Sequence, residues 1–386
     1  MNSSPEPRKF VAPEFVFGRG ALQLVGQYAV NFEASRAFLV TDPGVIDAGH
    51  VERVQAALAG AGVQTVIFGD VSPNPRAEET MLGARSFDES GCDLLVAVGG
   101  GSPMDAAKAI GIVHANHRHI LEFEGVDRVD IPGPPLICVP TTAGTASDVS
   151  QFTIVLNSYE RIKIAIISKG VIPDVALIDP ETTLTMDAKL TAVTGMDAMV
   201  HAMEAYTSNA ASPLTDLHAL RAIGLLHAYL PTTLENLDDI HLRSQVMLAS
   251  LHAGLAFTNA SLGAAHALAH SLGGYLDLPH GECNAVLLDA VTNANYPYAE
   301  SAYDRIAEVM NLKPSGRPVA DKCAMLVEEI RRFRRRLGLS RSLTQMGVRA
   351  EDLPGIAARA KMDPCLATNP RPLTLEDIET LYGQAL

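Results

Sequence analysis

The sequence lacks tryptophan, and aromatic residues make up only 5% of its 386 residues. This scarcity argues against an aromatic cage or a base-stacking platform as the main binding device. The chain also lacks a run of about 20 apolar residues, the length that a membrane-crossing helix requires. The polar stretch 1–9 has no apolar signal core behind it, so we expect a protein without membrane contact.

Positive charge is in short supply as well. The chain has 30 Lys and Arg against 44 Asp and Glu, a formal net charge of −14. A nucleic-acid binder needs clustered cations, so this balance argues against a nucleic-acid partner. The one basic run, 331–336, follows two glutamates and precedes Gly338. This pattern predicts the cationic end of a helix at a glycine cap.

Cysteines are few and unpaired in sequence. The five cysteines are widely spaced and form no CxxC pair. Such a set indicates reduced thiols in a cytoplasmic protein and no cysteine-based zinc site.

Length and apolar content point to two folded domains. A chain of 386 residues exceeds one ordinary core, and its 47% hydrophobic and 19% charged residues are typical of a globular protein. The first half alternates helical segments such as 51–61 with short apolar runs, which predict strands over 36–41, 63–68, 94–98, 136–139 and 175–178. This alternation predicts an α/β fold with a parallel, doubly wound sheet.

The second half differs from the first in composition and in the periodicity of its apolar residues. From about Asp187 to the end, long segments rich in alanine and leucine show helical periodicity. We therefore expect an α/β dinucleotide-binding domain over 1–184 and an all-helical metal-binding and substrate domain over 185–386.

A glycine-rich turn follows the apolar run 94–98. Gly99, Gly100 and Gly101 lead directly into a predicted helix, for which Ser102 is the expected N-cap and Asp105 the acid of a capping box. Glycines let a ligand approach the backbone amides, and a helix N-terminus favours an anion, so a dinucleotide pyrophosphate suits this turn. On this turn alone, a tight strand–helix connection without a ligand is the alternative.

Two further features lie at predicted strand ends. A second polar turn, 140–147, follows the strand at 136–139, and open α/β sheets bind ligands at this carboxyl edge. Asp42 follows the strand at 36–41, where a carboxylate accepts hydrogen bonds from a ribose 2′-OH and repels a 2′-phosphate. We therefore expect NAD in preference to NADP, although an isolated aspartate here is also a common turn residue.

Histidine and aspartate are spaced as metal ligands in the helical half. Asp197 and His201 form one i, i+4 pair, His266 and His270 form another, and His280 lies in a turn-like segment. A set of imidazoles and one carboxylate without thiolates suits a catalytic Fe²⁺ or Zn²⁺ ion. For any single histidine, a hydrogen-bonded helix residue is the alternative.

At this point the chain resembles the iron-containing (group III) alcohol dehydrogenases over essentially its whole length. The histidine signature is the most specific part of the resemblance, and the glycine turn is the least. The matching stretches are Gly99-Gly100-Gly101-Ser102, Thr141-Thr142-Ala143-Gly144-Thr145, 173–180, Gly195-Met196-Asp197-Ala198, 266–274, Pro279-His280-Gly281 through Asn284-Ala285, and Thr368-Asn369-Pro370-Arg371.

The resemblance implies a Rossmann-like domain and a helical domain in a dehydroquinate-synthase-like arrangement, with the active site between them. It implies that the metal ligands are Asp197, His201, His266 and His280, while His270 lies near substrate and nicotinamide. The expected cofactor contacts are Asp42, Gly99, Gly100, Gly101, Ser102, Asp105, Thr141, Thr142, Thr145 and Lys163. The chain departs from the family at Ala146-Ser147-Asp148, where Gly-Ser-Glu is common, and the alignment at Lys163 is less secure.

The expected function is that of an NAD-linked alcohol dehydrogenase or aldehyde reductase for small primary alcohols, with Fe²⁺ preferred over Zn²⁺. Homo-oligomers are usual in the family.

The alternative is a glycerol or diol dehydrogenase, or another enzyme of the dehydroquinate-synthase type. A phosphorylated substrate needs cations, and Met186 to Ala285 contains only Lys189, Arg221 and Arg243, which favours a neutral substrate. A non-catalytic binding protein would tolerate the loss of a ligand, and all four are present. We expect His270, as the histidine outside the ligand set, to relay the alcohol proton.

Overall fold

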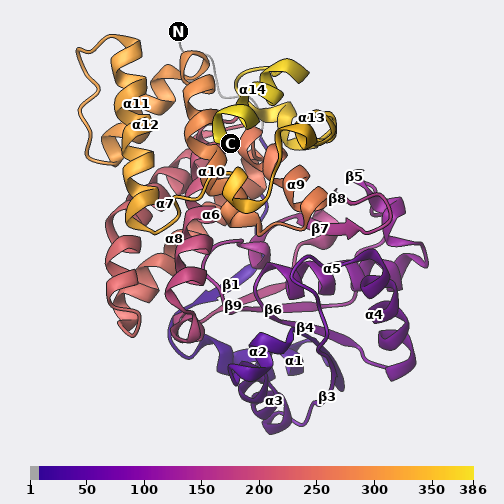
Figure 1. Cartoon of the computed structure of the whole chain (residues 1–386). Coiled ribbons are helices and arrows are strands. Elements are labelled where there is room, and N and C mark those ends of the chain that lie inside the picture. The colour runs from indigo at the N-terminus through magenta and orange to yellow at the C-terminus, as the bar shows by residue number, and fades with distance from the viewer. Residues whose placement is uncertain (1–7) are drawn as a thin grey trace.

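The computed structural model describes residues 8–386 and consists of an α/β part and a helical part. In Figure 1 the α/β part occupies the lower half, in indigo to magenta, and the helical part lies above it. The expectation about the polar stretch 1–9 falls largely outside the described residues.

The α/β part is built on a six-stranded, wholly parallel sheet. Its strands, in spatial order, are β1 (Glu14–Phe17), β9 (Val175–Ile178), β6 (Leu136–Pro140), β4 (Leu94–Gly99), β2 (Arg36–Val40) and β3 (Gln64–Phe68). If β1 is left aside and the other five strands are renumbered in chain order, their spatial order is the doubly wound order 2-1-3-4-5. The direction in which strands are added to the sheet reverses between β2 and β4, although all strands remain parallel. Ligands of such sheets bind at the carboxyl ends of the strands beside this reversal.

Helices cover both faces of the sheet, and alternate strand residues enter two separate cores. Along β2, Leu39 packs with α1 (Val25–Asn31) and α3 (His50–Gly60), while its neighbour Phe38 packs with α4 (Ala77–Ser90) and α5 (Gly101–Asn116). Because successive side chains of a strand point to opposite faces, a sheet covered on both faces reads as a continuous apolar run. A short helix, α2 (Pro43–Asp47), follows β2.

The sheet confirms the predicted fold class, and all five predicted strands are present within a residue or two of their expected ends. The sequence analysis missed β1, at the sheet edge, and a separate three-stranded sheet. That small sheet contains β5 (Gly125–Val126), β8 (Ile162–Ile167) and β7 (Phe152–Asn157), with β7 and β8 antiparallel. It carries Lys163 toward the helical part.

The second part is entirely helical within the described residues. Its helices are α6 (Ala188–Thr207), α7 (Pro213–Glu235), α8 (Ile240–Ala260), α9 (Ala264–Leu276), α10 (His280–Asn295), α11 (Glu300–Val309), α12 (Val319–Arg336), α13 (Leu353–Ala360) and α14 (Leu375–Ala385). The basic run ends α12 just before Gly338, as predicted, and Arg334 there pairs with Asp289. No helix within residues 8–386 is long and apolar enough to cross a membrane.

One hydrophobic core joins the two parts. The core of the helical part includes Ala143, Ala146, Val149 and Phe152, which belong to the loop after β6 and to β7. The boundary proposed near residue 184 falls in a 3-10 helix, Pro180–Thr185, between β9 and α6. The loop after β6 is therefore fixed by packing against the helices.

We predict that Gly144→Ala lowers the melting temperature. A Cβ atom at Gly144 would lie 2.4 Å from the backbone oxygen of Thr194 on α6, so the loop and the helix would have to separate. Overpacking of this kind costs about 1–3 kcal/mol, or a fall of roughly 1–4 °C for a chain of this length, measured by thermal unfolding. Gly383→Ala on α14 is the control, because no atom lies within 4 Å of its added Cβ. Equal melting temperatures for the two variants would contradict this reading of the loop.

Candidate metal centre and active site

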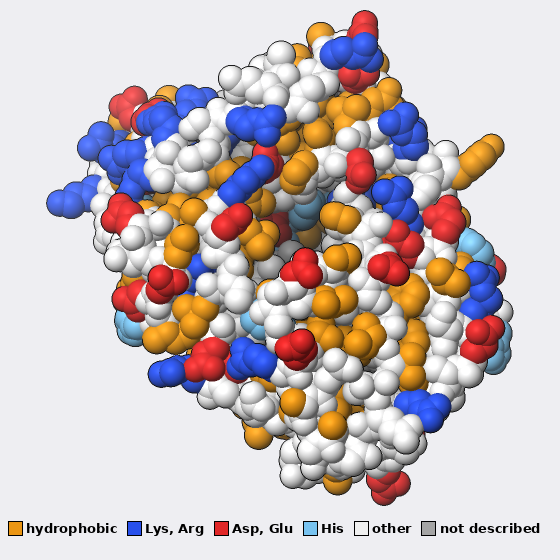
Figure 2. Space-filling view, turned by 60° about the horizontal axis from the view of Figure 1, so that its bottom comes forward, with side chains coloured by type: hydrophobic (Ala, Val, Ile, Leu, Met, Phe, Trp, Pro, Cys, Tyr) orange, Lys and Arg blue, Asp and Glu red, His pale blue; other side chains and the backbone are white. Residues whose placement is uncertain are grey.

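A cleft of about 1050 Å³ lies between the carboxyl ends of β2, β4 and β6 and the helices α6 and α10. Figure 2 shows a hollow on this face with histidine atoms at its bottom. Of the sequence-predicted residues, the cleft is lined by Asp42, Gly100, Gly101, Ser102, Thr141, Thr142, Thr145, Asp197 and His280. The strand-end residues thus meet at the reversal point of the sheet.

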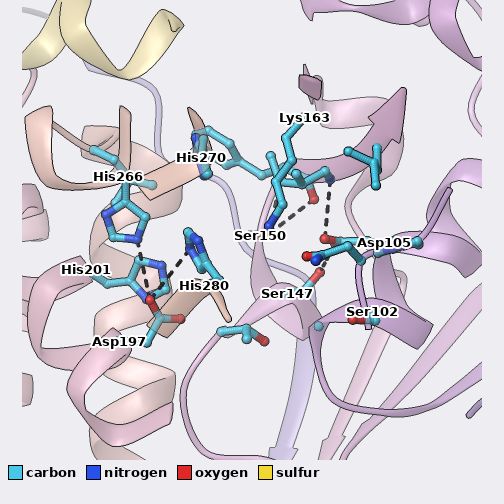
Figure 3. A pocket seen from close by; sticks show the side chains of 18 of the residues that line it. Ser102, Asp105, Ser147, Ser150, Lys163, Asp197, His201, His266, His270 and His280 are labelled. Carbon is cyan, nitrogen blue, oxygen red and sulfur yellow. Dashed lines mark hydrogen bonds and ion pairs between the residues drawn. The ribbon is translucent and has the colours of Figure 1, made fainter. Parts of the chain in front are cut away.

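A smaller pocket of about 200 Å³ adjoins the cleft and shares part of its lining. Asp105 and Lys163 line it from the α/β part, and Asp197, His201, His266, His270 and His280 line it from the helices (Figure 3). Gly99 belongs to neither lining, although it directly precedes Gly100. Apart from Gly99, the predicted site residues therefore surround one continuous space.

The glycine turn starts the helix differently from the prediction. α5 begins at Gly101 with Gly100 as its N-cap, and neither Ser102 nor Asp105 caps it. The predicted N-cap and capping box are wrong, because both side chains have tertiary partners: the Ser102 hydroxyl donates to the carbonyl of Pro73, and Asp105 accepts from Ser147. The first residues of α5, Gly101 and Ser102, still line the cleft.

The glycines also make room for the second turn. A Cβ atom at Gly100 would lie 3.2 Å from the Thr142 side chain, and one at Gly101 would lie 3.1 Å from that of Thr145. The two turns that the sequence presents separately are therefore packed together, with hydroxyls beside backbone amides. This combination suits a pyrophosphate group.

A buried lysine, Lys108, holds the second turn in place. Its Nζ donates to the carbonyl oxygens of Phe152 (2.8 Å) and Ser150 (2.9 Å) and to the Ser147 hydroxyl (3.2 Å). Ser147 in turn donates to Asp105 at 2.6 Å. Burial lowers the pKa of Lys108, and the nearby Asp105 opposes this effect. The sequence analysis overlooked Lys108, although a lone cation in an otherwise apolar helix was a signal.

Asp42 caps the helix after β2, as an ordinary turn residue does. Its Oδ1 accepts from the backbone amide of Val45 at 3.0 Å. Burial raises the pKa of Asp42, and this backbone bond opposes the effect. The residue is only half-buried and lines the cleft, so its carboxylate remains available to a ligand.

The predicted metal donors come from three helices and converge. Asp197 and His201 lie on α6, His266 lies on α9, and His280 is the first residue of α10, a helix start where a turn was expected. The Asp197 Oδ1 lies 3.7 Å from the Nε2 atoms of both His266 and His280. The His201 and His266 rings stack with centroids 4.5 Å apart. One carboxylate and three imidazoles facing one point fit a borderline divalent cation.

Three of the four donors carry a charge that suits a cation, and His266 is the exception. Burial lowers the pKa of His201 to about 4 and lowers that of His280, so both rings are neutral and offer lone pairs. Burial acts to raise the pKa of Asp197, but the surrounding imidazoles outweigh it and hold that pKa well below its usual range. Burial acts to lower the pKa of His266, but its hydrogen bonds with Asp197 and Glu204 outweigh it and raise the pKa to about 9.

Glu204 orients His266, and the sequence analysis missed it. Its buried carboxylate accepts from His266 Nδ1 at 2.6 Å and from the backbone amides of Gly263 (3.0 Å) and Ala265 (2.6 Å), at the start of α9. The proton on Nδ1 is thereby directed toward Glu204. This leaves the lone pair of Nε2 facing the centre, where it can bind a metal ion. The signal was present, because Glu204 follows His201 by three residues on one helical face.

Asp363 holds the other histidine of the α9 pair. His270 Nδ1 lies 2.8 Å from Asp363 Oδ2, and the Asp363 Oδ1 accepts from the amide of Cys365. The His270 ring stacks on that of His280 with centroids 5.2 Å apart. His270 therefore borders the centre while it is bonded to a separate carboxylate. Asp363 lies 93 residues further along the chain, and nothing near it in sequence signals this role.

Other side chains complete the pocket. Phe257 stacks on His201 with a centroid distance of 4.4 Å. Lys163 reaches the pocket because Gly273 lacks a side chain: a Cβ atom there would lie 2.9 Å from Lys163 Nζ. Burial lowers the pKa of Lys163. The count of cations between Met186 and Ala285 overlooked this one, which comes from the α/β part.

The departure from the family at Ala146 has a structural cost. Ala146 has φ 49°, a left-handed conformation that costs a residue with a Cβ atom about 1 kcal/mol or more. Its side chain fits because Gly254 faces it: a Cβ atom at Gly254 would lie 2.5 Å from that of Ala146. Asp148 is buried, and burial raises its pKa to about 6.

Comparison with known families gives one consistent result. Residues 12–180 match the family model described as "Iron-containing alcohol dehydrogenase", and residues 191–386 match "Fe-containing alcohol dehydrogenase family, C-terminal".

Individual relatives match over nearly their full length. The chain is 36% identical to the NAD-dependent methanol dehydrogenase of Bacillus methanolicus, covering 98% of this chain and 99% of that one. It is 37% identical to the 1,3-propanediol dehydrogenase of Citrobacter freundii, covering 96% of both chains. A crystal structure of 1,3-propanediol oxidoreductase has a TM-score of 0.95 at 36% identity, covering 99% of this chain and 100% of that one. The alcohol dehydrogenase from Oenococcus oeni has a TM-score of 0.95 at 32% identity, covering 98% and 100%.

We predict that Glu204→Gln weakens divalent-cation binding. Glutamine offers one acceptor oxygen and no charge where the carboxylate receives three N–H groups, so His266 loses its fixed orientation. Loss of a partner that orients a ligand typically costs 10- to 100-fold in affinity. The dissociation constant is measured by competition with a chelator.

The matched control is Glu329→Gln, which removes the charge from another buried glutamate. Glu329 pairs with His227 at 2.9 Å, between α12 and α7 and outside the centre. It should leave the dissociation constant unchanged. An equal loss in both variants would mean that Glu204 acts on the fold and not on the centre.

Proposed function

Because the chain belongs to the iron-containing alcohol dehydrogenase family, we propose that it is a metal-dependent, NAD-linked alcohol dehydrogenase that also reduces the corresponding aldehydes. Its substrates are small, largely neutral primary alcohols, in keeping with the methanol and propanediol relatives. In this proposal the segment 1–184 binds the dinucleotide, and the segment 185–386 binds the metal and the substrate.

One observation carries the proposal: four side chains suited to a metal converge beside a cleft that is lined by the glycine turn at the start of α5. Asp197, His201, His266 and His280 are the proposed ligands. When bound, the ion would supply Lewis acidity toward the substrate oxygen, and the dinucleotide would supply the hydride chemistry. The first turn of α5 and the hydroxyls of Thr142 and Thr145 hold the pyrophosphate.

His270 is the residue that we assign to proton transfer. Its Nδ1 is bonded to Asp363, so the ring is held in one orientation, with Nε2 as the atom that exchanges a proton with the alcohol. The neighbouring rings of His280 and His266 leave His270 at the edge of the centre. Lys163, on the other side of the pocket, is proposed to contact the dinucleotide.

Cofactor and metal identity follow from chemistry and family. Asp42 supports NAD over NADP, since its carboxylate binds a ribose 2′-OH and repels a 2′-phosphate. We propose Fe²⁺ as the physiological ion, supported by the family description, while the same donors also suit Zn²⁺.

We also propose a cytoplasmic location and a homo-oligomeric state. The first is supported by the five cysteines, all free in the structure, and the second by what is usual in the family. We propose no nucleic-acid or membrane partner, because the net charge is −14.

A diol is the second candidate substrate, because 1,3-propanediol dehydrogenases share 37% identity with this chain.

The test is a turnover panel of primary alcohols and aldehydes of one to six carbons, with 1,3-propanediol, using NAD and NADP. We expect turnover with NAD to exceed that with NADP. Chelation should abolish turnover while circular dichroism stays near native, because both parts have large apolar cores that do not need the ion. Added Fe²⁺ or Zn²⁺ should restore activity. Full activity in metal-free protein would refute the Lewis-acid mechanism.

A second prediction separates the two histidines of α9. His266→Ala should lose the metal and nearly all turnover, because it removes a proposed ligand. His270→Ala should keep the metal but turn over about 10²-fold more slowly, since proton transfer loses its acid–base group. Metal analysis and steady-state kinetics distinguish the two. If His270→Ala loses the metal while His266→Ala keeps it, the assignments must be exchanged.

A further inference from the structure

A further cavity, of about 410 Å³, lies in the helical part, between the starts of α6 and α10 and the ends of α7 and α12 (Figure 1). Within residues 8–386, it shares no lining residue with the cleft or with the smaller pocket at the metal centre. The first turn of α10 separates these spaces, because Gly281 lines the cleft whereas Glu282 lines the cavity. The cavity is therefore a site of its own, with about twice the volume of the smaller pocket.

Most of the wall of this cavity is aliphatic. It includes the side chains of Ala192, Leu234, Ala285, Leu337, Leu339 and Met346. Among the described residues that line it, none is aromatic and none has a hydroxyl or an amide side chain. A nucleotide would therefore find no ring for its base to stack on, and a sugar would find few partners for its hydroxyls. Such a wall suits an aliphatic chain.

The polar side chains of the cavity are all charged, and cations outnumber carboxylates. Its lining contains three cations, Lys189, Arg336 and Arg341, and one acid, Glu282. The buried Glu282 carboxylate lies 2.9 Å from Lys189 through Oε1 and 3.3 Å from Arg341 through Oε2, so both of its oxygens are engaged. One carboxylate among three cations leaves an excess of positive charge, although the chain as a whole has a net charge of −14.

Arg336 is the cation that remains available to a ligand. It is exposed at the end of α12, and within the described residues no oxygen atom accepts a hydrogen bond from its guanidinium. The arginines before it are engaged, since Arg334 pairs with Asp289 and Arg335 pairs with Glu328. A guanidinium with free N–H groups binds a carboxylate through two parallel hydrogen bonds. Arg336 is therefore suited to hold an anionic head group at the mouth of the cavity.

We propose that this cavity binds an aliphatic carboxylate of medium chain length, such as a fatty-acid anion. The hydrocarbon chain lies against the aliphatic wall, and the carboxylate pairs with Arg336. A single negative charge matches the one cation without a partner, whereas the Glu282 carboxylate in the same wall would repel a dianion more strongly. The site goes beyond the proposed alcohol dehydrogenase activity and does not depend on it.

The first test is a calorimetric titration of the full chain with octanoate, and with butanoate and octylammonium for comparison. Each methylene that enters an apolar wall tightens binding about fourfold, so octanoate should bind on the order of 10²-fold more tightly than butanoate. Octylammonium has the same chain and the opposite charge, and it should not bind. Equal affinities for octanoate and butanoate would overturn the proposal, because an arginine on the surface does not sense chain length. Absence of octanoate binding would overturn it too.

Two substitutions with opposite expected effects place the ligand in this cavity. Arg336→Gln should weaken octanoate binding about 10-fold, the low end for a hydrogen bond to a charged group. Glu282→Gln should tighten octanoate binding roughly twofold to fivefold, the range of an exposed ion pair, because it removes the competing carboxylate and releases Lys189 and Arg341. A change that only disturbed the packing around the cavity would weaken binding in both variants.

The matched control is Arg335→Gln, which removes the adjacent exposed arginine of α12. Arg335 pairs with Glu328 and does not line the cavity, so its loss should leave the octanoate affinity unchanged. Equal octanoate affinities of the two arginine variants would place the ligand elsewhere, for example at the metal centre, and overturn the proposal. Weaker binding by Glu282→Gln than by the wild type would also overturn it. If Glu282→Gln does not fold, the two exposed arginine variants decide the question.

Discussion

The buried carboxylate of Glu204 is the constraint on which the centre depends. A buried negative charge is costly unless it is paired and hydrogen-bonded, and Glu204 meets this requirement with two backbone amides of α9 and the ring of His266. A helix N-terminus is a favourable place for a carboxylate, so the same bonds fix α9 against α6. The position of α9 then sets where both of its histidines lie. One electrostatic requirement therefore fixes the helix, the ring orientation and the donor atom together.

The two histidines of α9 have different environments because different carboxylates hold them. His266 is bonded to Glu204 and faces Asp197, whereas His270 is bonded to Asp363, from the loop before the 3-10 helix Pro364–Thr368. Sequence spacing alone makes them equivalent, since residues four apart share a helical face. The distinction between a ligand and a proton-transfer residue is thus proposed to lie in their partners.

The loop after β6 serves both the α/β part and the helices. The loop after β6 contributes Thr142 and Thr145 to the cleft and Ala146 and Val149 to the core of the helical part. Lys108 holds the same loop through hydrogen bonds to Ser147, Ser150 and Phe152. The proposed cofactor site and the metal centre are therefore held in a fixed relation by packing and by buried hydrogen bonds, which tolerate little displacement.

The sequence by itself determined the fold class, five of the six strands of the parallel sheet and the i, i+4 pairs, because these depend on local periodicity and spacing. It did not reveal β1, which has four residues, or the small sheet, which depends on neighbouring elements for stability although β7 and β8 have six residues each. It placed the N-cap of α5 at Ser102, whereas packing against Pro73 engages that hydroxyl elsewhere. Only the tertiary structure decided which carboxylate meets which histidine, because these contacts join residues up to 93 positions apart. Such pairings depend on how whole helices pack, and no local pattern encodes that.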